Sequence, residues 1–334
     1  MATKKRISIK DIAKAAGTSI TTVSFILNGK AKERRISDAV NKRVLDYVRR
    51  MGYKPSQFVR NGAANQTKVL ALLVDDIHHP FFSEVGEHME RVASERGYQV
   101  VYSNTGTKTE KIDQLVKLWM DKEVDGICMV PSEDLSEALS KIKKQHVPTV
   151  FVDSFIPDVN IPYVVSDHRK GAYDATVHLL ATGSKRVGLI SLYSNRVQMR
   201  ARQDGYMDAM DESQKQSFIR KLNIEDPDST IGEEIVAFIV ENKLEAVLFA
   251  DHYLAIHGLK AIKEQAIDIP RIVAFDDHVL FALHTPAISV VTQDTAQIAG
   301  AVMDMLTARI DGKVSENSGL IVPYVLIARE SSIS

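Results

Sequence analysis

Short apolar runs alternate with amphipathic segments along most of the chain, from about residue 69 onward. Each run has the length of a strand buried on both faces, and the longer segments repeat apolar residues at helical spacing. Strands separated by helices form parallel sheets with right-handed crossovers. The predicted strands are residues 69–74, 98–103, 126–130, 149–153, 163–166, 187–191, 246–250, 271–275 and 288–291. The predicted helices are residues 80–96, 109–122, 168–182, 229–242, 252–265 and 294–310.

Nine predicted strands are too many for one compact unit of this kind, so we expect two lobes. The predicted fold class is α/β: a two-lobed, doubly wound parallel-sheet body behind a small helical head. We expect the head at residues 1–54, a linker at 55–68 and the body at 69–334. Lobe one is expected at about 69–163 and 293–320, and lobe two at about 164–292 and 321–330.

The head carries a pattern of three short helices. The first follows Ser8, whose hydroxyl is a suitable cap, and ends at Gly17. The second runs from about Ile20 to Leu27, with Leu27 among its inward residues, and the third follows Ser37. Two short helices joined by a tight glycine turn and supported by a third resemble a helix-turn-helix, which places its second helix in the major groove of DNA. The alternative is a helical subdomain without a ligand.

Charge separates the head from the body. Residues 1–68 hold 16 lysines and arginines but only four acidic residues, a net charge of +12. The whole chain has a formal net charge of −1, so the remainder carries −13. A basic head on an acidic body is typical of a nucleic-acid-binding module joined to another domain.

The segments SIKDIAKAAGTSITTVSFILNGK and ISDAVNKRVLDYVRRMGYKPS resemble the head of the LacI/GalR family of bacterial transcription regulators, over residues 7–57 apart from the basic loop 30–35. The resemblance implies that Ile20, Thr21 and Phe25 meet base edges. The other DNA-binding positions that it implies are Ser19, Thr22, Ser24, Asn28, Lys30, Tyr53 and Phe58.

Phe25 departs from the family, which commonly has arginine at this position. Phenylalanine lacks the bidentate contact to guanine, worth roughly 1–3 kcal/mol of discrimination, but it is able to contact a thymine methyl group. We therefore expect an operator without the usual guanine preference at that step.

The linker also departs from the family, in which it folds on DNA into a hinge helix whose leucine wedges into the minor groove. Gly62 stands at the leucine position in this chain, and glycine cannot wedge. Either the hinge is weaker, or Phe58 or Val59 supplies the apolar contact. A plain flexible tether is the remaining alternative.

Polar and aromatic residues follow the predicted strands of the body. Carboxyl ends of parallel strands are where ligands bind in such sheets. Carboxylates and an arginine facing aromatic rings suit a polyhydroxylated small ligand, although each carboxylate taken alone is more often a helix cap and each ring more often core. The expected effector-binding residues are Phe81, Phe82, Asp153, Arg202, Asp251, Asp276 and Gln293.

The resemblance to the family extends through the body, which implies a fold like that of periplasmic sugar-binding proteins and a homodimer. Most of the expected effector positions match residues that contact small molecules, often sugars, in the family. Asp251-His252 replaces the more usual Asn-Asp, which removes donors and adds charge. A cationic group or an extra hydroxyl on the ligand is therefore favoured.

The sequence lacks the common catalytic and nucleotide-binding motifs: G-x-G-x-x-G, G-x-x-x-x-G-K-[ST], G-x-S-x-G and H-E-x-x-H. His78 and His79 are adjacent, so their side chains diverge and make a poor metal pair. Cys128 is the only cysteine and sits in an apolar run, where an inert buried thiol is expected. We therefore expect a non-enzyme with no catalytic residues, no metal site and no cofactor.

Three functions remain open. The leading one is a cytoplasmic, ligand-responsive regulator, most often a repressor in this family, with double-stranded operator DNA, a sugar-like effector and a second copy as partners. The second is a solute-binding protein for sugar uptake with a helical appendage, although the start of the chain lacks the apolar core of a signal peptide. The third is an α/β enzyme with such an appendage. No apolar stretch approaches the about 20 residues of a membrane span.

Overall fold

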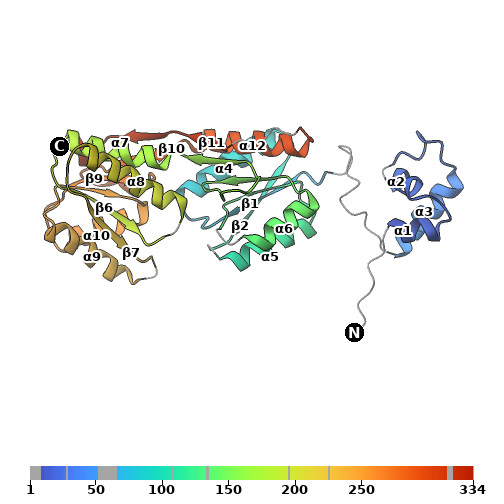
Figure 1. Cartoon of the computed structure of the whole chain (residues 1–334), viewed down its shortest axis with the longest axis horizontal. Coiled ribbons are helices and arrows are strands. Elements are labelled where there is room, and N and C mark those ends of the chain that lie inside the picture. Colours follow the sequence, from blue (N-terminus) through green and yellow to red (C-terminus); the bar gives the residue numbers. More distant parts are fainter. Residues whose placement is uncertain are drawn as a thin grey trace. The chain divides into compact units, whose positions relative to one another are not determined.

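The computed structural model describes residues 9–27, 29–51, 66–106, 108–132, 135–194, 196–224, 226–313 and 319–333 (Figure 1). The chain divides into two compact units, Met1–Gln66 and Thr67–Ser334. Ser8, Asn28, Tyr53, Phe58 and most of the predicted linker, including Val59 and Gly62, lie outside the described residues.

The first unit contains the three predicted helices: α1 (Ile9–Ala15), α2 (Ile20–Leu27) and α3 (Asp38–Met51). Gly17 joins the first two in the left-handed conformation, with φ +60°. The inward residues of α2 are Val23 and Ile26, whereas Leu27 is only half-buried. Leu27 packs on the same cluster as a partly buried residue, as expected, and Ile26 is a further buried residue of this helix.

The second unit begins with a six-stranded sheet in the order β11-β5-β4-β3-β1-β2. The paired strands are all parallel. The strands are β1 (Val69–Val74), β2 (Gln99–Asn104), β3 (Gly126–Met129), β4 (Thr149–Val152), β5 (Tyr163–Ser166) and β11 (Gly319–Val322). Helices cover both faces (Figure 1): α4 (Pro80–Glu95) and α12 (Thr295–Ile310) lie on one, and α5 (Thr109–Asp121) and α6 (Ser136–Gln145) on the other.

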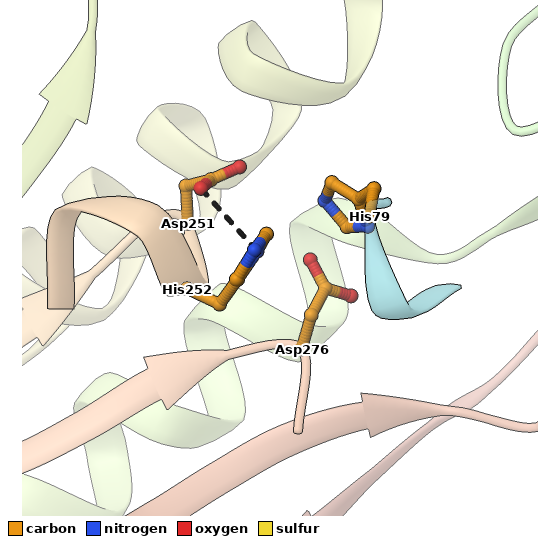
Figure 2. A group of neighbouring side chains, drawn as sticks. All are labelled: His79, Asp251, His252 and Asp276. Atoms are coloured by element: carbon orange, nitrogen blue, oxygen red, sulfur yellow. Dashed lines mark ion pairs between the residues drawn. The ribbon is translucent and has the colours of Figure 1, made fainter. Parts of the chain in front are cut away.

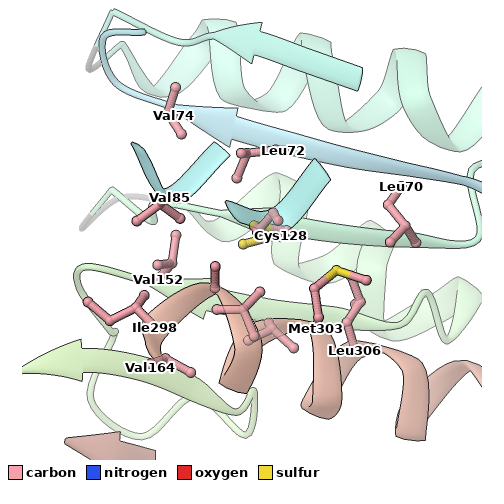
Figure 3. Close-up of a cluster of buried hydrophobic side chains, with 14 of the residues drawn as sticks. Leu70, Leu72, Val74, Val85, Cys128, Val152, Val164, Ile298, Met303 and Leu306 are labelled. Atoms are coloured by element: carbon pink, nitrogen blue, oxygen red, sulfur yellow. The ribbon is translucent and has the colours of Figure 1, made fainter. Parts of the chain in front are cut away.

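Alternate side chains of each strand enter the two cores on either side of this sheet, because successive residues of a strand point to opposite faces. Leu70 and Leu72 pack with α4 and α12 in the cluster of Figure 3. Ala71 and Leu73 pack with α5 and α6. Cys128 lies in the first of these clusters with no exposure, and burial raises the pKa of its thiol.

The second sheet has the order β12-β10-β9-β8-β6-β7. Its strands are β6 (Val187–Leu192), β7 (Phe218–Leu222), β8 (Ala246–Phe249), β9 (Arg271–Phe275), β10 (Ser289–Gln293) and β12 (Tyr324–Ile327). The edge strand β12 is antiparallel to β10. One face packs on α7 (His168–Ala181) and α8 (Val197–Glu212). The other packs on α9 (Asp228–Glu241), α10 (His252–Glu264) and α11 (Val279–Leu283), and α13 (Glu330–Ile333) ends the described chain.

The chain passes between the two sheets three times, after β5, after β10 and after β11. Because β5 and β11 belong wholly to the first sheet, two crossings come a few residues later than the expected lobe boundaries at 164 and 321. Three crossing segments allow two sheets to move relative to each other without unfolding.

The predicted fold class is confirmed, with two doubly wound sheets behind N-terminal helices. Seven elements of the described residues fall outside the predicted ranges: α6, α8, α11, α13, β7, β11 and β12. Among the described residues, none of the helices combines the length and the apolar character that a bilayer crossing requires.

Candidate functional site

The exposed face of α2 presents part of the expected DNA-binding set. Ser19, Thr21 and Lys30 are exposed, and Ile20 keeps 44% of its surface in solvent. The exposed part of Ile20 gives this face of α2 an apolar surface. The Ser19 hydroxyl caps α2 by accepting a hydrogen bond from the backbone N–H of Thr22 over 3.0 Å.

Phe25 lies further along α2 and is half-buried, as are Thr22 and Ser24. The guanidinium of Arg34 stacks over the Phe25 ring, 4.8 Å from its centre. Sequence reasoning did not single out Arg34, although it lies in the basic loop that follows α2. The pair places the positive charge of Arg34 against the face of the Phe25 ring.

In the second unit, the expected effector residues lie at the carboxyl ends of strands from both sheets. Asp153 follows β4, Asp276 follows β9 and Gln293 ends β10. Asp153 and Asp276 have φ values of +67° and +62°. Such left-handed backbone is unusual outside glycine and often marks a functional site.

Arg202 of α8 is the centre of the network, with 3% of its side chain exposed. Its Nη1 donates to the carbonyl of Ala250 over 2.5 Å, and its Nη2 donates to the Tyr324 hydroxyl over 3.0 Å. The guanidinium lies 3.6 Å from Oδ2 of Asp276 and stacks over the Phe275 ring at 4.2 Å. A buried arginine held from four directions is a preorganised partner for an acceptor on a ligand.

Polar side chains also connect the two sheets. The Ser166 hydroxyl, at the end of β5, donates to Oε1 of Gln293 over 2.6 Å, and Nε2 of Gln293 donates to Oδ1 of Asp276 over 2.8 Å. From α8, Gln198 donates to Oδ2 of Asp153 over 3.0 Å. Hydrogen bonds therefore connect the two lobes at two places, Ser166 with Gln293 and Asp153 with Gln198.

Burial changes the protonation of this system. It raises the pKa of Asp153 to about 6, against the opposing effect of Arg202. Burial acts most strongly on the pKa of Asp276 and would raise it. Arg202, His79, the hydrogen bond from Gln293 and His252 together outweigh burial, so the pKa falls below its usual value. Burial, together with Arg202, lowers the pKa of His168 to about 3, which keeps that imidazole neutral.

A cavity of about 150 Å³ opens beside these groups and is lined in part by Asp153, Phe155, His168 and Gln198. Two residues that line the cavity have a buried side-chain atom without a hydrogen-bond partner in the described structure: Nε2 of His168 and Oε1 of Gln198. Unsatisfied buried polar atoms are costly, so a native protein retains them where a ligand or water completes them.

The two expected aromatic contacts lie in the core of the first lobe. Phe81 and Phe82 are 4% and 5% exposed and belong to the cluster behind β1. Phe81 also borders the small hollow at Asp276 and Gln293, whereas Phe82 does not. Phe155, stacked on Tyr163 with ring centres 4.5 Å apart, is an aromatic residue that lines the cavity itself.

Several residues of this site were missed by sequence reasoning. His168 and Tyr324 are joined by a 2.8 Å hydrogen bond, and both lie close to Arg202. His252 packs edge-on against His79, with ring centres 4.4 Å apart, and burial lowers the pKa of His252. His168 and His252 both begin a helix just after a strand, which is the signal that pointed to the aspartates.

Comparison with known proteins agrees with this architecture. Residues 8–56 match the bacterial regulatory proteins of the lacI family, and residues 176–332 match the periplasmic binding protein-like domain. The chain is 28% identical over 332 residues to the HTH-type transcriptional regulator RegA of Clostridium saccharobutylicum, covering 98% of this chain and 99% of RegA. It is 28% identical over 337 residues to the HTH-type transcriptional repressor PurR of Haemophilus influenzae strain PittEE, covering 97% and 98%.

Among solved structures, the complex of the transcriptional regulator CelR with cellobiose has the same fold. Its TM-score is 0.71 at 22% identity, covering 98% of this chain and 100% of the CelR chain. The relatives are named as regulators of transcription and not as enzymes. A solute-binding protein is not favoured either, since the matching head is that of a DNA-binding regulator. This chain therefore combines a DNA-binding head of the lacI type with a periplasmic binding protein-like body, and it is similar to transcriptional regulators over almost its whole length.

Proposed function

We propose that this protein is a cytoplasmic repressor that binds operator DNA as a homodimer, and that a sugar or sugar-like metabolite bound between its two sheets controls its affinity for DNA. The proposed division of the chain is a DNA-binding head at residues 1–54, a hinge linker at 55–68 and an effector-binding body at 69–334. We further propose that it has no enzymatic activity.

The observation that carries the effector site is the buried network around Arg202, beside a cavity whose lining residues His168 and Gln198 each have a buried polar atom without a partner in the described structure. Carboxylates accept from sugar hydroxyls, while a guanidinium and an amide donate to them. Phe155 offers a flat face for the carbon skeleton of a sugar. CelR, which shares the fold, was solved with cellobiose, and this supports the same ligand class here.

The face of α2 supports DNA reading by the head. Ile20, Thr21 and Phe25 are the proposed base-contacting residues, with Phe25 held beside Arg34. Ser19, Thr22, Ser24 and Lys30 are the proposed phosphate contacts among the described residues. The net charge of +12 on residues 1–68 supplies the nonspecific attraction that any duplex exerts on such a head.

An exposed apolar group on α11 supports the homodimer. Val279, Leu280 and Leu283 keep 68%, 50% and 75% of their surfaces in solvent. Three large apolar residues on one five-residue helix are more than a monomer usually exposes at one place. A two-fold related copy would bury them and would place two heads on a near-palindromic operator.

Regulation follows from the position of the cavity. Its lining comes from Asp153 and Ser166 at the ends of first-sheet strands and from Gln198 on α8 of the second lobe. A ligand that contacts both lobes favours one relative position of the two sheets, and it changes operator affinity only by its differential affinity for the two forms. The name of PurR supports repression as the sign of the control.

A thermal-shift screen of the full-length protein against monosaccharides, disaccharides and sugar phosphates tests the site. We expect one class to raise the melting temperature in proportion to its occupancy. Gln198→Met should weaken that ligand at least about tenfold, the value of one or more lost hydrogen bonds. Gln203→Met, the same change on the same helix, should leave the affinity within threefold. Equal affinity in both variants would contradict the proposal that the ligand binds in the cavity lined by Gln198.

A further inference from the structure

A second group of side chains lies at one end of the Arg202 network (Figure 2). His79, Asp251, His252 and Asp276 each offer a ligand atom, and these four atoms all lie within 4.8 Å of one another. His79 precedes α4, which packs on the first sheet, whereas the other three residues follow strands of the second sheet. Figure 2 shows the four side chains turned toward a common centre.

We propose that His79, Asp251, His252 and Asp276 bind a divalent transition-metal ion, of which Zn²⁺ is the reference case, and that this ion bridges the two lobes. Two imidazole nitrogens with two carboxylate oxygens form a mixed donor set that suits zinc and its neighbours. Magnesium and calcium prefer oxygen alone, so neither is the expected ion.

The spacing of His252 and Asp251 fits two ligands of one ion. Nδ1 of His252 lies 3.5 Å from Oδ1 of Asp251. Ligand atoms about 2.1 Å from a tetrahedral ion are about 3.4 Å apart. Nδ1 of His252 is buried and has no hydrogen-bond partner in the described structure, as expected for a nitrogen that waits for a ligand.

The charge of the region also calls for a cation. The charged side chains that act on Asp153 or Arg202, together with these two residues, are Asp75, Asp153, Asp251, Asp276, Arg196 and Arg202. Four carboxylates against two guanidiniums give a net charge of −2 when all are ionised. Arg202 pairs with Asp276, 3.6 Å away, and does not neutralise Asp251 and Asp153 as well. One divalent ion brings the group to neutrality, which is the favoured state for buried charges.

Binding of the ion changes the hydrogen bonding of His79 more than that of the other three ligands. The backbone N–H of Phe81 donates to its Nδ1 over 3.3 Å, so ligation has to come from Nε2. A neutral imidazole that ligates through Nε2 carries its proton on Nδ1, so this long hydrogen bond is given up on binding. His252 and Asp251 therefore anchor the ion, and His79 joins when the lobes are close together.

The test uses the full-length protein, stripped with a chelator and titrated with ZnCl₂ in a calorimeter against a competing chelator. We expect one Zn²⁺ per chain and no heat with MgCl₂. His252→Asn and His79→Asn should each weaken Zn²⁺ at least about 30-fold, since even the outer-shell partners of metal ligands change affinity 10–100-fold. Asparagine at residue 79 keeps a side-chain acceptor for the Phe81 N–H, so α4 retains its cap.

Matched controls separate the site from the surface. His78→Asn changes the neighbouring exposed histidine, and His257→Asn changes a histidine on α10 outside the donor set. Both should bind Zn²⁺ within threefold of the unmodified protein. Asp251→Asn, whose amide oxygen still caps α10, is the third test variant should either histidine variant fold poorly. Stoichiometry near zero, or equal affinity in test and control variants, overturns the proposal.

A change of operator affinity with Zn²⁺ is a second readout, and this coupling rests on the proposed function. Operator binding is measured both with excess chelator and with Zn²⁺. Loss of specific operator binding under both conditions would contradict the proposed function, whereas intact operator binding without Zn²⁺ uptake would contradict only the metal site.

Discussion

The hydroxyl of Ser166, the last residue of β5, donates a 2.6 Å hydrogen bond to Oε1 of Gln293, the last residue of β10. These strands belong to different sheets, so the bond ties one lobe to the other at the bottom of the proposed effector site. Both residues are buried, with 4% and 7% of their surfaces exposed.

Removal of the Ser166 hydroxyl should lower the free energy of unfolding more than removal of a hydroxyl on the surface. Ser166→Ala leaves Oε1 of Gln293 without its donor in a buried place, and we expect a loss of about 1–3 kcal/mol in the free energy of unfolding. Urea denaturation measures it, with the exposed Ser213→Ala as the control. A loss under 0.5 kcal/mol in the free energy of unfolding, of the order seen for surface changes, would show that this hydrogen bond does not stabilise the contact between the two lobes.

Asp153 should make stability fall as pH rises. Its pKa is about 6 in the folded protein and about 3.9 in an unfolded chain, so the folded state binds the proton more tightly. Its contribution is fully present below about pH 4 and is lost as the pH rises through about 6. Asp153→Asn should therefore stabilise the protein by roughly 1–3 kcal/mol at pH 8, with little effect at pH 4.

Denaturation of Asp153→Asn and of the exposed Asp268→Asn at both pH values checks this sign. The stability of Asp268→Asn relative to the unmodified protein should be the same at both pH values. Equal stability of Asp153→Asn and the unmodified protein at pH 8 would mean that Arg202 and Gln198 compensate the buried charge fully.

Two helical glycines should respond in opposite ways to the same change. A Cβ on Gly205 of α8 would come 1.9 Å from the carbonyl oxygen of Arg169 on α7, so the two helices would have to separate. A Cβ on Gly300 of α12 meets nothing within 4 Å. Gly205→Ala should lower the melting temperature strongly, by an overpacking cost of about 1–3 kcal/mol or more, and Gly300→Ala should raise stability by about 0.5–1 kcal/mol.

Calorimetric melting of the two variants measures both effects. Tolerance of Gly205→Ala without loss would contradict the close α7–α8 packing that positions Arg202, three residues away on the same helix.

The sequence predicted the fold well where burial dominates the pattern. The run 69–74, VLALLV, is buried at all but its first position and was expected as a strand. The edge strand β7, FIRKL, was missed because its middle residues are polar and only its two ends are buried. β11 and β12 lie in one apolar run, GLIVPYVLI, and the structure divides this run at Pro323 into two short strands of different sheets, which no local pattern records.

The candidate site was only partly predictable for a different reason. Asp153, Asp276 and Gln293 follow strands, and this rule identified them. Their partners His168 and Tyr324 join the same network through contacts between elements remote in the sequence, which no local pattern records. The contact between His79 and His252 was not predictable either, because the two residues belong to different lobes and meet only in the folded chain.

Phe25 should set the operator preference at one step. Phe25→Arg restores the side chain that pairs with guanine, so it should add a guanine preference of roughly 1–3 kcal/mol at that base pair. Selection of sites from random duplex DNA compares this variant with the unmodified protein and with Phe25→Ala. A strong guanine at that step for the unmodified protein, lost in Phe25→Ala, would refute the proposed role of the phenylalanine.

Operator binding under effector control is the central claim, and fluorescence anisotropy of labelled promoter fragments with the full-length protein tests it most directly. We expect one fragment to bind at least about 10³-fold more tightly than random duplex, with affinity that falls steeply as salt rises. The sugar that stabilises the body should change that affinity by about 5–150-fold. Equal affinity for every fragment at low salt, or specific binding that no sugar in the screen alters, would contradict the account.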